Sequence, residues 1–293
     1  MRTPRIGVLC TQVRLEEKLI FEALRKRGVP FERVDVRELV LELGGDGRDS
    51  SRGIAGRYDV VLMRCLSHSR AMHAARALEA RGVRTVNPSA VIETCGDKVL
   101  TTLALFEHGL PSPRTALAFS EAAGLEAVER IGYPAVLKPP IGSWGRLMAK
   151  ANDREAAEAL LEHQAALNRM DEAPFYVQEY VNKPGRDLRT LVVGGRTVYA
   201  ITRSSEHWIT NTARGGQAAS LEISEEIDRL SCAAAAAVGG EIVAVDLLEN
   251  ADGALLVNEV NHTPEFHGAA EATGLDIAGS MVDYLIHVAR ERV

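Results

Sequence analysis

Near the end of the chain, two carboxylates and an amide stand where their oxygens could bind a cation, in the stretch DLLENADGALLVNEVN at residues 246–261. Glu259 and Asn261 lie two residues apart, so on a strand both side chains project to the same side. Residues 250–253, with the sequence NADG, are typical of a tight turn. A hairpin closed by this turn brings Asp246 nearly level with Glu259, so the pattern predicts a cluster of oxygen ligands.

Magnesium is one explanation for such a cluster. Burying carboxylates without a partner costs free energy, because each charge loses its hydration. Mg²⁺ takes oxygen ligands from Asp, Glu and Asn, typically one or two carboxylates together with phosphate oxygens. One interpretation is therefore that Asp246, Glu259 and Asn261 bind Mg²⁺. The alternative is a solvated sheet edge, or carboxylates paired with arginine, and the hairpin alone fits either one.

Groups that could hold phosphate lie farther upstream. Lys138 ends the apolar run PAVLK, where its ammonium can reach an anion, and the loop GSWGR follows at residues 142–146. Glycines let backbone N–H groups approach a phosphate closely, and the serine and arginine of this loop add donors. Lys98 begins an expected helix and could face the same anion. The alternatives are a plain hairpin turn and a solvated surface lysine.

Two further segments could bind other parts of a nucleotide. The run VQEYV at residues 177–181 ends a strand, where exposed backbone and Glu179 could hydrogen-bond adenine, and Asp187 could bind ribose hydroxyls. Both acids could equally be ordinary surface residues. The polar loop RSSEHWITNTARGG at residues 203–216 holds two guanidiniums and an amide. Together they could clamp a transferring phosphoryl group, and they are Arg203, Asn211 and Arg214.

These segments need a mixed framework of helices and strands. In about the first 90 residues strands alternate with helices, which predicts a small parallel sheet, whereas the rest mixes helices with antiparallel hairpins and predicts α+β modules. Besides the hairpin described above, the expected strands are residues 5–10, 31–36, 59–65, 83–87, 134–140, 145–150 and 174–181, and a hairpin at 187–203. The expected helices are residues 14–27, one ending near 81, 97–109, 152–168 with a capping box of Asn152 and Glu155, 224–238, and one at the C-terminus.

Composition narrows the class of protein. The chain has 293 residues, 46% hydrophobic and 25% charged, which is ordinary for a globular protein of two or three small domains. The net charge of −6 does not point to nucleic acid or to an anionic membrane. No apolar run reaches the roughly 18 residues of a membrane span, and the charged start is unlike a signal peptide. Four widely spaced cysteines predict no zinc site or disulfide framework, so we expect a cytoplasmic protein.

The order of these motifs along the chain is more specific than any one of them. It resembles the ATP-grasp ligases, and most closely the LysX/ArgX/RimK family, whose first members act on an amino-group carrier protein. The matching stretches are VIETCGDK, GYPAVLKPPIGSWGR, QEYVNKPGRDLR, HWITNTARGGQA and AVDLLENADGALLVNEVNHTPEF. The resemblance covers essentially the whole chain and is weakest in residues 1–60.

The resemblance implies a three-module ATP-grasp fold. It comprises an N-terminal α/β domain at residues 1–94, a central module at 95–178 and a C-terminal module at 179–293, and the last two clamp ATP. It also implies that Asp246, Glu259 and Asn261 bind Mg²⁺, as two ions. The residues implied to bind ATP are Lys98, Lys138, Gly142, Ser143, Trp144, Gly145, Arg146, Gln178, Glu179, Tyr180, Val181, Asp187 and Asn211.

The reaction implied by the resemblance proceeds through an acyl phosphate. ATP phosphorylates the C-terminal glutamate of a small acidic carrier protein similar to LysW, and the amino group of an amino acid displaces the phosphate. Arg214 with Arg203 would stabilise the developing charge, and Arg189 would hold carboxylate or phosphate oxygens. The family implies a dimer or tetramer. A basic face of Arg25, Lys26, Arg27, Arg64, Arg70 and Arg76 could receive the carrier.

The amino donor is expected where three segments converge. Its candidate contacts are Arg64, Ser67, His68, Arg70, Trp208, Thr210, Asn211, Thr212, Glu265, Phe266, Gly268 and Ala269. Arg64 and Arg70 could bind a carboxylate or form a salt link at the end of the third strand. Gly268 and Ala269 match neither the aminoadipate nor the glutamate pattern of the family, so the donor stays open. Alternatives are a RimK-like glutamate ligase acting on another protein or small molecule, a carrier-protein ligase of a secondary pathway, and a nucleotide-binding module without catalysis.

Overall fold

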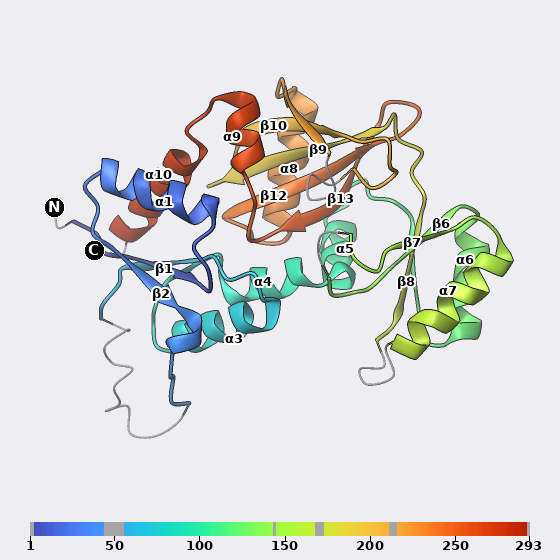
Figure 1. The fold of residues 1–293 in the computed structure, drawn as a ribbon, viewed down its shortest axis with the longest axis horizontal. Coiled ribbons are helices and arrows are strands. Elements are labelled where there is room, and N and C mark those ends of the chain that lie inside the picture. Colours follow the sequence, from blue (N-terminus) through green and yellow to red (C-terminus); the bar gives the residue numbers. More distant parts are fainter. Residues whose placement is uncertain (1–2, 44–55, 143–144, 168–172, 211–215, 292–293) are drawn as a thin grey trace.

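The computed structural model describes residues 3–43, 56–142, 145–167, 173–210 and 216–291. Within these residues the strands form three separate sheets, one near each end of the molecule and one between them (Figure 1). The first sheet is parallel and the other two are antiparallel. The prediction of a parallel sheet followed by hairpin-based modules is therefore confirmed.

The N-terminal sheet has the order β2-β1-β3-β4. Its strands are short: β1 (Ile6–Cys10) and β3 (Val60–Met63) are apolar runs, and β2 (Phe31–Asp35) and β4 (Thr85–Val86) flank them. A 3-10 turn, η1 (Val36–Glu38), follows β2. The strands of the sheet centre are fully buried because helices cover both faces, as in most parallel sheets. Figure 1 shows α1 (Leu15–Lys26) on one side, and α3 (His68–Glu79) and α4 (Ser89–Gly96) on the other.

The central sheet has the order β5-β8-β6-β7 and carries two helices on one face. Its strands are β5 (Thr115–Ala118), β6 (Ala135–Lys138), β7 (Ala149–Ala151) and β8 (Phe175–Glu179). The helices are α6 (Glu121–Ile131) and α7 (Arg154–Leu167), and α5 (Lys98–Glu107) leads into the module. The predicted capping box is wrong by one position, because Asp153 rather than Asn152 accepts the hydrogen bond from the backbone N–H of Ala156 (2.8 Å).

The C-terminal sheet has the order β11-β10-β9-β12-β13. It consists of β9 (Arg186–Val193), β10 (Arg196–Ser204), β11 (Gln217–Leu221), β12 (Ile242–Glu249) and β13 (Leu255–Asn261). Its helices are α8 (Glu225–Ala237), α9 (His267–Thr273) and α10 (Ile277–Arg290). Both predicted hairpins are therefore confirmed.

Shared cores tie the N-terminal sheet to the C-terminal sheet. One core packs α1 and β1 of the N-terminal sheet against α10, β9 and β10, so the end of the chain returns to its beginning. A second core packs α4 and α5 against the opposite face of the C-terminal sheet, where α8 also lies. We propose that the boundaries between the three modules lie at residues 94 and 178. None of the described helices combines the length and apolarity that crossing a bilayer requires.

Candidate functional site

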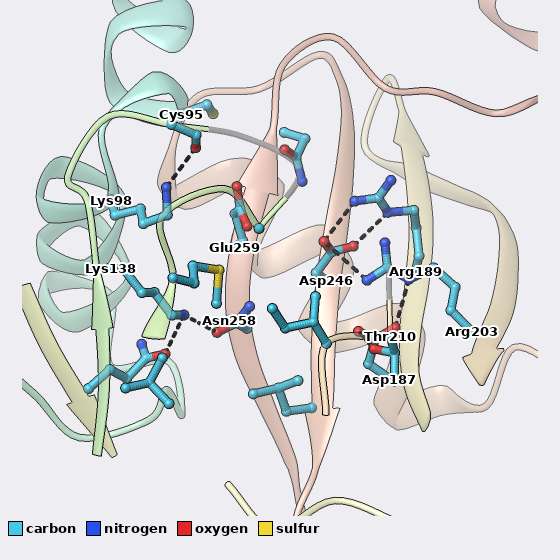
Figure 2. Close-up of a pocket in the computed structure, with 18 of the residues that line it drawn as sticks. Cys95, Lys98, Lys138, Asp187, Arg189, Arg203, Thr210, Asp246, Asn258 and Glu259 are labelled. Atoms are coloured by element: carbon cyan, nitrogen blue, oxygen red, sulfur yellow. Dashed lines mark hydrogen bonds and ion pairs between the residues drawn. The ribbon is translucent and has the colours of Figure 1, made fainter. Parts of the chain in front are cut away.

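A cavity of about 360 Å³ lies between the central and C-terminal sheets. It is lined by strand residues of β6, β8, β9, β10, β12 and β13 and by the loops that follow them, and Figure 2 shows its polar side chains. The cavity gathers predicted residues from distant parts of the chain. They are Lys98, Lys138, Gly142, Gly145, Gln178, Glu179, Tyr180, Val181, Asp187, Arg189, Arg203, Asp246, Glu259 and Asn261.

The hairpin of β12 and β13 sets the acidic side chains opposite each other. Asp246 pairs directly with Glu259, whereas the next pair is Leu247 with Val257, so Asn258 is an extra residue in the strand. This β-bulge lets Val257 and Val260 both enter the core, while Asn258 and Glu259 both line the cavity. The sequence analysis missed Asn258. The spacing of three between two buried valines, which a regular strand cannot place on one face, was the available signal.

Asp246 is held by arginine. Arg189 donates two hydrogen bonds of 2.7 Å to its carboxylate, and Arg203 Nη2 lies 3.3 Å from Oδ2. Burial alone would raise the pKa of Asp246, but the two guanidiniums outweigh burial and lower it to about 2. The alternative of a carboxylate paired with arginine therefore applies to this residue. Arg189 holds a protein carboxylate here, where the sequence analysis expected it to hold substrate or phosphate oxygens.

Glu259 has a different environment. It is half-buried, and its carboxylate makes no hydrogen bond or ion pair with another described residue. In Figure 2 it lies between Lys98 and Lys138 on one side and Asp246 on the other. Nearby, Asn261 lines the cavity, and its buried Nδ2 has no partner in the described part of the chain.

These oxygens fit a hard cation. Two carboxylates and an amide face one cavity, one of the carboxylates forms no ion pair with a described residue, and oxygen is the ligand that Mg²⁺ prefers. The described residues contain no group of three or more His, Cys, Asp or Glu arranged for a metal. A cation here would therefore need further oxygens from a bound phosphate, as Mg²⁺ commonly does.

Lys138 provides a buried ammonium at the edge of the cavity. Its Nζ donates to Gln178 Oε1 (2.5 Å) and Asn258 Oδ1 (3.1 Å), which leaves one of its three donors for a ligand. Burial lowers its pKa from an ordinary 10.5 to about 8, although the charge of Glu259 opposes the shift. Lys98 at the start of α5 donates instead to the carbonyl of Gly142 (2.7 Å) and so holds the start of the GSWGR loop.

Residues expected to bind adenine and ribose also line the cavity, but two of them already have partners. Glu179 accepts a hydrogen bond from the backbone N–H of Arg114 (2.9 Å). Asp187 accepts from Arg203 Nε (2.7 Å) and from the hydroxyl of Thr210. The ribose role of Asp187 therefore stays a prediction that requires exchange of a partner.

Lys183 is a cavity residue that the sequence analysis missed. It donates to Thr210 (2.8 Å), and its Nζ lies 3.6 Å from Asp187. Burial lowers its pKa. Its position between the QEYV and GRDLR motifs was the signal that could have identified it.

At its other end the cavity meets the expected donor-binding segments. His68, Trp208, Thr210 and Glu265 line it, together with His262. Burial lowers the pKa of His68 and also that of His262, to about 4, so both rings are uncharged near neutral pH. Ser67, Arg64 and Arg70 instead line a smaller neighbouring cavity.

Several predicted residues lie elsewhere. None of Phe266, Gly268 and Ala269 lines the cavity. Phe266 and Ala269 are buried in the core around α9 and α10. Gly268 has open space around it, because a methyl group added there would meet no atom within 4 Å. Arg146 is exposed and is absent from the cavity wall. The predicted residues outside the described ranges are Ser143, Trp144, Asn211, Thr212 and Arg214.

Comparison with known proteins identifies this arrangement. Residues 95–285 match the RimK-like ATP-grasp domain, and residues 6–94 match the LysX preATP-grasp domain. The chain is 36% identical to the glutamate–LysW ligase ArgX of Sulfurisphaera tokodaii over 283 residues, which cover 96% of this chain and 98% of that protein. It is 32% identical to the α-aminoadipate–LysW ligase LysX of Saccharolobus solfataricus over 271 residues, or 92% and 96% of the two chains.

A solved structure agrees in fold. The RimK domain ATP-grasp protein of Sphaerobacter thermophilus superposes with a TM-score of 0.74 at 26% identity, covering 96% of this chain and 99% of that one. The match therefore extends over all three sheets. The chain belongs to the LysX/ArgX/RimK family of ATP-grasp ligases, enzymes that join a carboxylate to an amine.

Proposed function

We propose that this ligase phosphorylates the C-terminal glutamate of a small acidic carrier protein and joins that glutamate to the α-amino group of glutamate or aminoadipate. The carrier and the two donors are those in the names of its relatives, ArgX and LysX. The observation on which the proposal mainly depends is the environment of Glu259. This residue is a carboxylate without a partner in the described residues, in one cavity with Asp246 and two lysines.

Nucleotide binding follows from the two sides of the cavity. Lys138, with one donor left, and Lys98 would contact the phosphates, and the backbone of residues 178–181 would receive adenine. Gly145 has a positive φ of 63°, and a methyl group there would lie 3.2 Å from Ile209. The GSWGR loop therefore approaches the 209–210 segment closely at Gly145, which suits a loop that covers phosphates.

Asp246, Glu259 and Asn261 would hold Mg²⁺, and we infer two ions. The cation supplies charge neutralisation on the phosphates and polarises the transferring phosphoryl group. Arg189 and Arg203 fix the carboxylate of Asp246 by hydrogen bonds at 2.7 Å and an ion pair at 3.3 Å. They therefore act by orienting a ligand, and Arg203 also orients Asp187 (2.7 Å).

The proposed reaction has two steps. A carboxylate oxygen of the carrier glutamate attacks the γ-phosphorus of ATP, the bond to the ADP oxygen breaks, and an acyl phosphate forms. The neutral amine then attacks the acyl carbon, the C–N bond forms, and phosphate leaves with the C–O bond electrons and takes up the proton that the amine loses. The chain contributes by holding both reactants in one cavity and by presenting the ammonium of Lys138 to the phosphates. Arg214, the further guanidinium proposed from the sequence, would add to this charge stabilisation.

The experiment that tests the function is intact-mass spectrometry of the acidic carrier protein encoded near this gene. The carrier is incubated with the enzyme, Mg²⁺–ATP and one amino acid at a time, including glutamate and aminoadipate. A mass gain equal to one donor residue is expected with one of them, together with ADP. No gain with any donor, while ATP binding is intact, would contradict the acceptor and favour a RimK-like ligase acting on another protein or small molecule.

The proposal also includes the oligomeric state of the protein. We infer a homo-oligomer, dimer or tetramer, as the family resemblance implies. Light scattering of the purified protein across a concentration series measures the molar mass directly. A mass of 31.7 kDa at every concentration would contradict the inference.

A further inference from the structure

A second, smaller cavity of about 200 Å³ lies beside the main one. It is lined by Thr11, Gln12, Arg14, Arg64, Leu66, Ser67 and Arg70. Thr11 directly follows β1, and Arg64 directly follows β3, so the cavity sits at the carboxyl ends of two adjacent parallel strands. From these strands the chain continues into α1 on one face and α3 on the other, and such a switch point is where open α/β sheets bind ligands.

The guanidinium of Arg64 is the least satisfied group at this place. Its side chain is 1% exposed, and it bonds Glu17 through Nε (2.9 Å) and the carbonyl of Pro264 through Nη1 (2.9 Å). Its Nη2 is buried and has no partner in the described residues. An unpaired donor on a buried charge costs free energy, so a ligand oxygen at Nη2 would be favoured.

The described residues that line the cavity include three guanidiniums and no carboxylate. Outside the lining, Glu17 bonds both Arg14 and Arg64, Glu265 bonds Arg14 (2.7 Å), and the charge of Glu16 also acts on Arg14 and Arg64. Arg70 is exposed and forms no ion pair within the described ranges. Ser67 precedes the first residue of α3 and makes no capping bond with its side chain, so the positive end of this helix also faces the cavity wall.

The two cavities adjoin each other at Leu66. Leu66 lines both, and Pro264, whose carbonyl Arg64 holds, lines the main one together with Glu265. A small molecule whose amine lies in the main cavity could therefore place an acidic group in the smaller one. Guanidinium groups match the two oxygens of a carboxylate in geometry and charge.

We propose that this cavity binds a carboxylate of the amino donor, with Arg64 Nη2 and Arg70 as its hydrogen-bond donors. The inference rests on the proposed function, because it assumes that the donor amine enters the main cavity. The carboxylate can be that of the side chain or the α-carboxylate of the donor. Both present the same chemistry to the arginines, and the choice of substrate separates them.

The test measures the KM of the donor and of ATP for Arg70→Ala, with Arg57→Ala as the control. Arg57 is another exposed arginine of the N-terminal domain, is paired with Glu32, lines neither cavity and lies outside the expected carrier-binding face. Loss of a hydrogen bond to a charged group should raise the donor KM roughly ten- to hundredfold in Arg70→Ala, with the KM of ATP unchanged. Arg70→Lys should recover part of the loss, and Arg57→Ala should match the wild type.

Two analogues identify the carboxylate. Glutamine lacks the side-chain carboxylate of glutamate, and 4-aminobutanoate lacks the α-carboxylate. The analogue for which Arg70→Ala has no effect names the group that the cavity binds, and either result supports the proposal. An unchanged donor KM in Arg70→Ala would overturn it.

A variant of Arg64 gives an independent reading. Arg64→Ala would leave Glu17 buried without its partner, so Arg64→Lys is used instead, which keeps a charge beside Glu17 and removes Nη2. We expect a higher donor KM at nearly wild-type Tm.

If the wild type forms no amide with any donor, the proposed function fails. Calorimetric titration of glutamate and aminoadipate into the wild type and Arg70→Ala then tests donor binding in the smaller cavity independently of turnover. Equal heats for the two proteins, or no binding to the wild type, would reject this binding role.

Discussion

Two carboxylates of one hairpin sit in different electrostatic environments, although they face each other across a strand pair. Asp246 is fixed by Arg189 and Arg203, so its charge is compensated by the protein itself. Glu259 has no such partner in the described residues and depends on what enters the cavity. Glu259 is therefore the residue whose change should separate activity from stability.

Glu259→Gln should abolish turnover while the fold remains intact. A bound metal typically contributes several kcal/mol of transition-state stabilisation. Loss of that stabilisation should lower kcat roughly a hundredfold or more. The Tm should change little, because no ion pair with a described residue is lost. Glu249→Gln is the control, since Glu249 lies on the same hairpin, pairs with Arg186 and is absent from the cavity wall. Near-normal kcat in Glu259→Gln would reject the metal assignment.

Lys138 should make ATP binding depend on pH. Its pKa in the folded protein is about 8, so the ammonium is charged below that pH and is lost as pH rises through it. We expect the Kd of a non-hydrolysable ATP analogue to rise above pH 8. Because the folded pKa lies below the unfolded value of 10.5, stability should change in the opposite sense and increase between pH 8 and 10.5.

Lys138→Arg is the matched variant for this measurement, because arginine stays charged across the whole range. Its analogue binding should show a flatter profile than the wild type as pH rises through the pKa of Lys138. Parallel profiles for the wild type and Lys138→Arg would show that another group titrates.

At the same scale, the sequence predicted residue types better than residue partners. Lys138, Asp246 and Glu259 were predicted because carboxylates and a lysine inside apolar runs are unusual in themselves. A salt link of Arg64 was one of the two alternatives and is present, but its partner Glu17 was not predicted, because the two residues lie 47 positions apart and meet only when α1 packs beside β3. Contacts of this kind depend on tertiary packing, which local patterns do not contain.

Among the elements, the β12–β13 hairpin carries the site through one irregularity. The bulge at Asn258 adds a side chain to the cavity face without removing Val257 or Val260 from the core. Asn258 Oδ1 then accepts from Lys138 (3.1 Å), so the bulge links the C-terminal sheet to the central one across the nucleotide site. The turn sequence predicted the hairpin, but an extra residue within a strand is visible only from the spacing of the valines.

Asn258→Val should weaken ATP binding and also lower the free energy of unfolding, because both depend on how the buried ammonium of Lys138 is held. The buried ammonium of Lys138 would keep Gln178 as its one side-chain acceptor, and losing a hydrogen bond to a charged group costs about 1.5–3 kcal/mol. We expect a roughly tenfold or larger increase in the Kd of the ATP analogue. Leu256→Ala is the control, because Leu256 lies two residues away on the strand and is absent from the cavity wall. Equal Kd values for the two variants would contradict a role for the bulge.

Other elements were missed for reasons that lie outside their own sequences. The strand β5 has four residues and pairs with β8, some 60 positions later. The helix α6 contains Gly124, which lowers helix propensity, yet a methyl group there would lie 2.7 Å from Leu161 of α7. Close packing of α6 on α7 therefore explains a glycine that, in sequence alone, argues against a helix.

On the scale of the whole molecule, the N- and C-terminal sheets act as one support for the site. The basic face expected to receive the carrier is largely neutralised, since Lys26, Arg27 and Arg76 pair with Glu22, Asp283 and Glu93. Of the arginines that line the smaller cavity, Arg14 and Arg64 are paired with glutamates, whereas Arg70 forms no ion pair within the described residues; the cavity lies beside the loop that follows β13. The position of that loop depends on how the two sheets are joined.

Asn87 joins the two sheets by four hydrogen bonds. It follows β4, is 2% exposed, donates to the carbonyls of Ile242 (2.7 Å) and His262 (2.9 Å), and accepts from the N–H groups of Glu241 and Ile242. Through His262 it holds the start of the segment that separates the two cavities. The site therefore depends on a residue that does not line it.

Asn87→Ala should destabilise the protein and weaken donor binding together. Each buried backbone group left without a partner costs about 1–3 kcal/mol, so we expect a loss of several kcal/mol in the free energy of unfolding. The KM of the donor should rise more than that of ATP, because the freed segment follows β13 and borders the donor end of the cavity. Chemical denaturation and steady-state kinetics measure the two effects, with Asn250→Ala in the exposed turn as the control. A destabilised Asn87→Ala enzyme with wild-type donor KM would show that the anchor supports the fold alone, and that the donor segment is positioned by its contacts with Arg14 and Arg64.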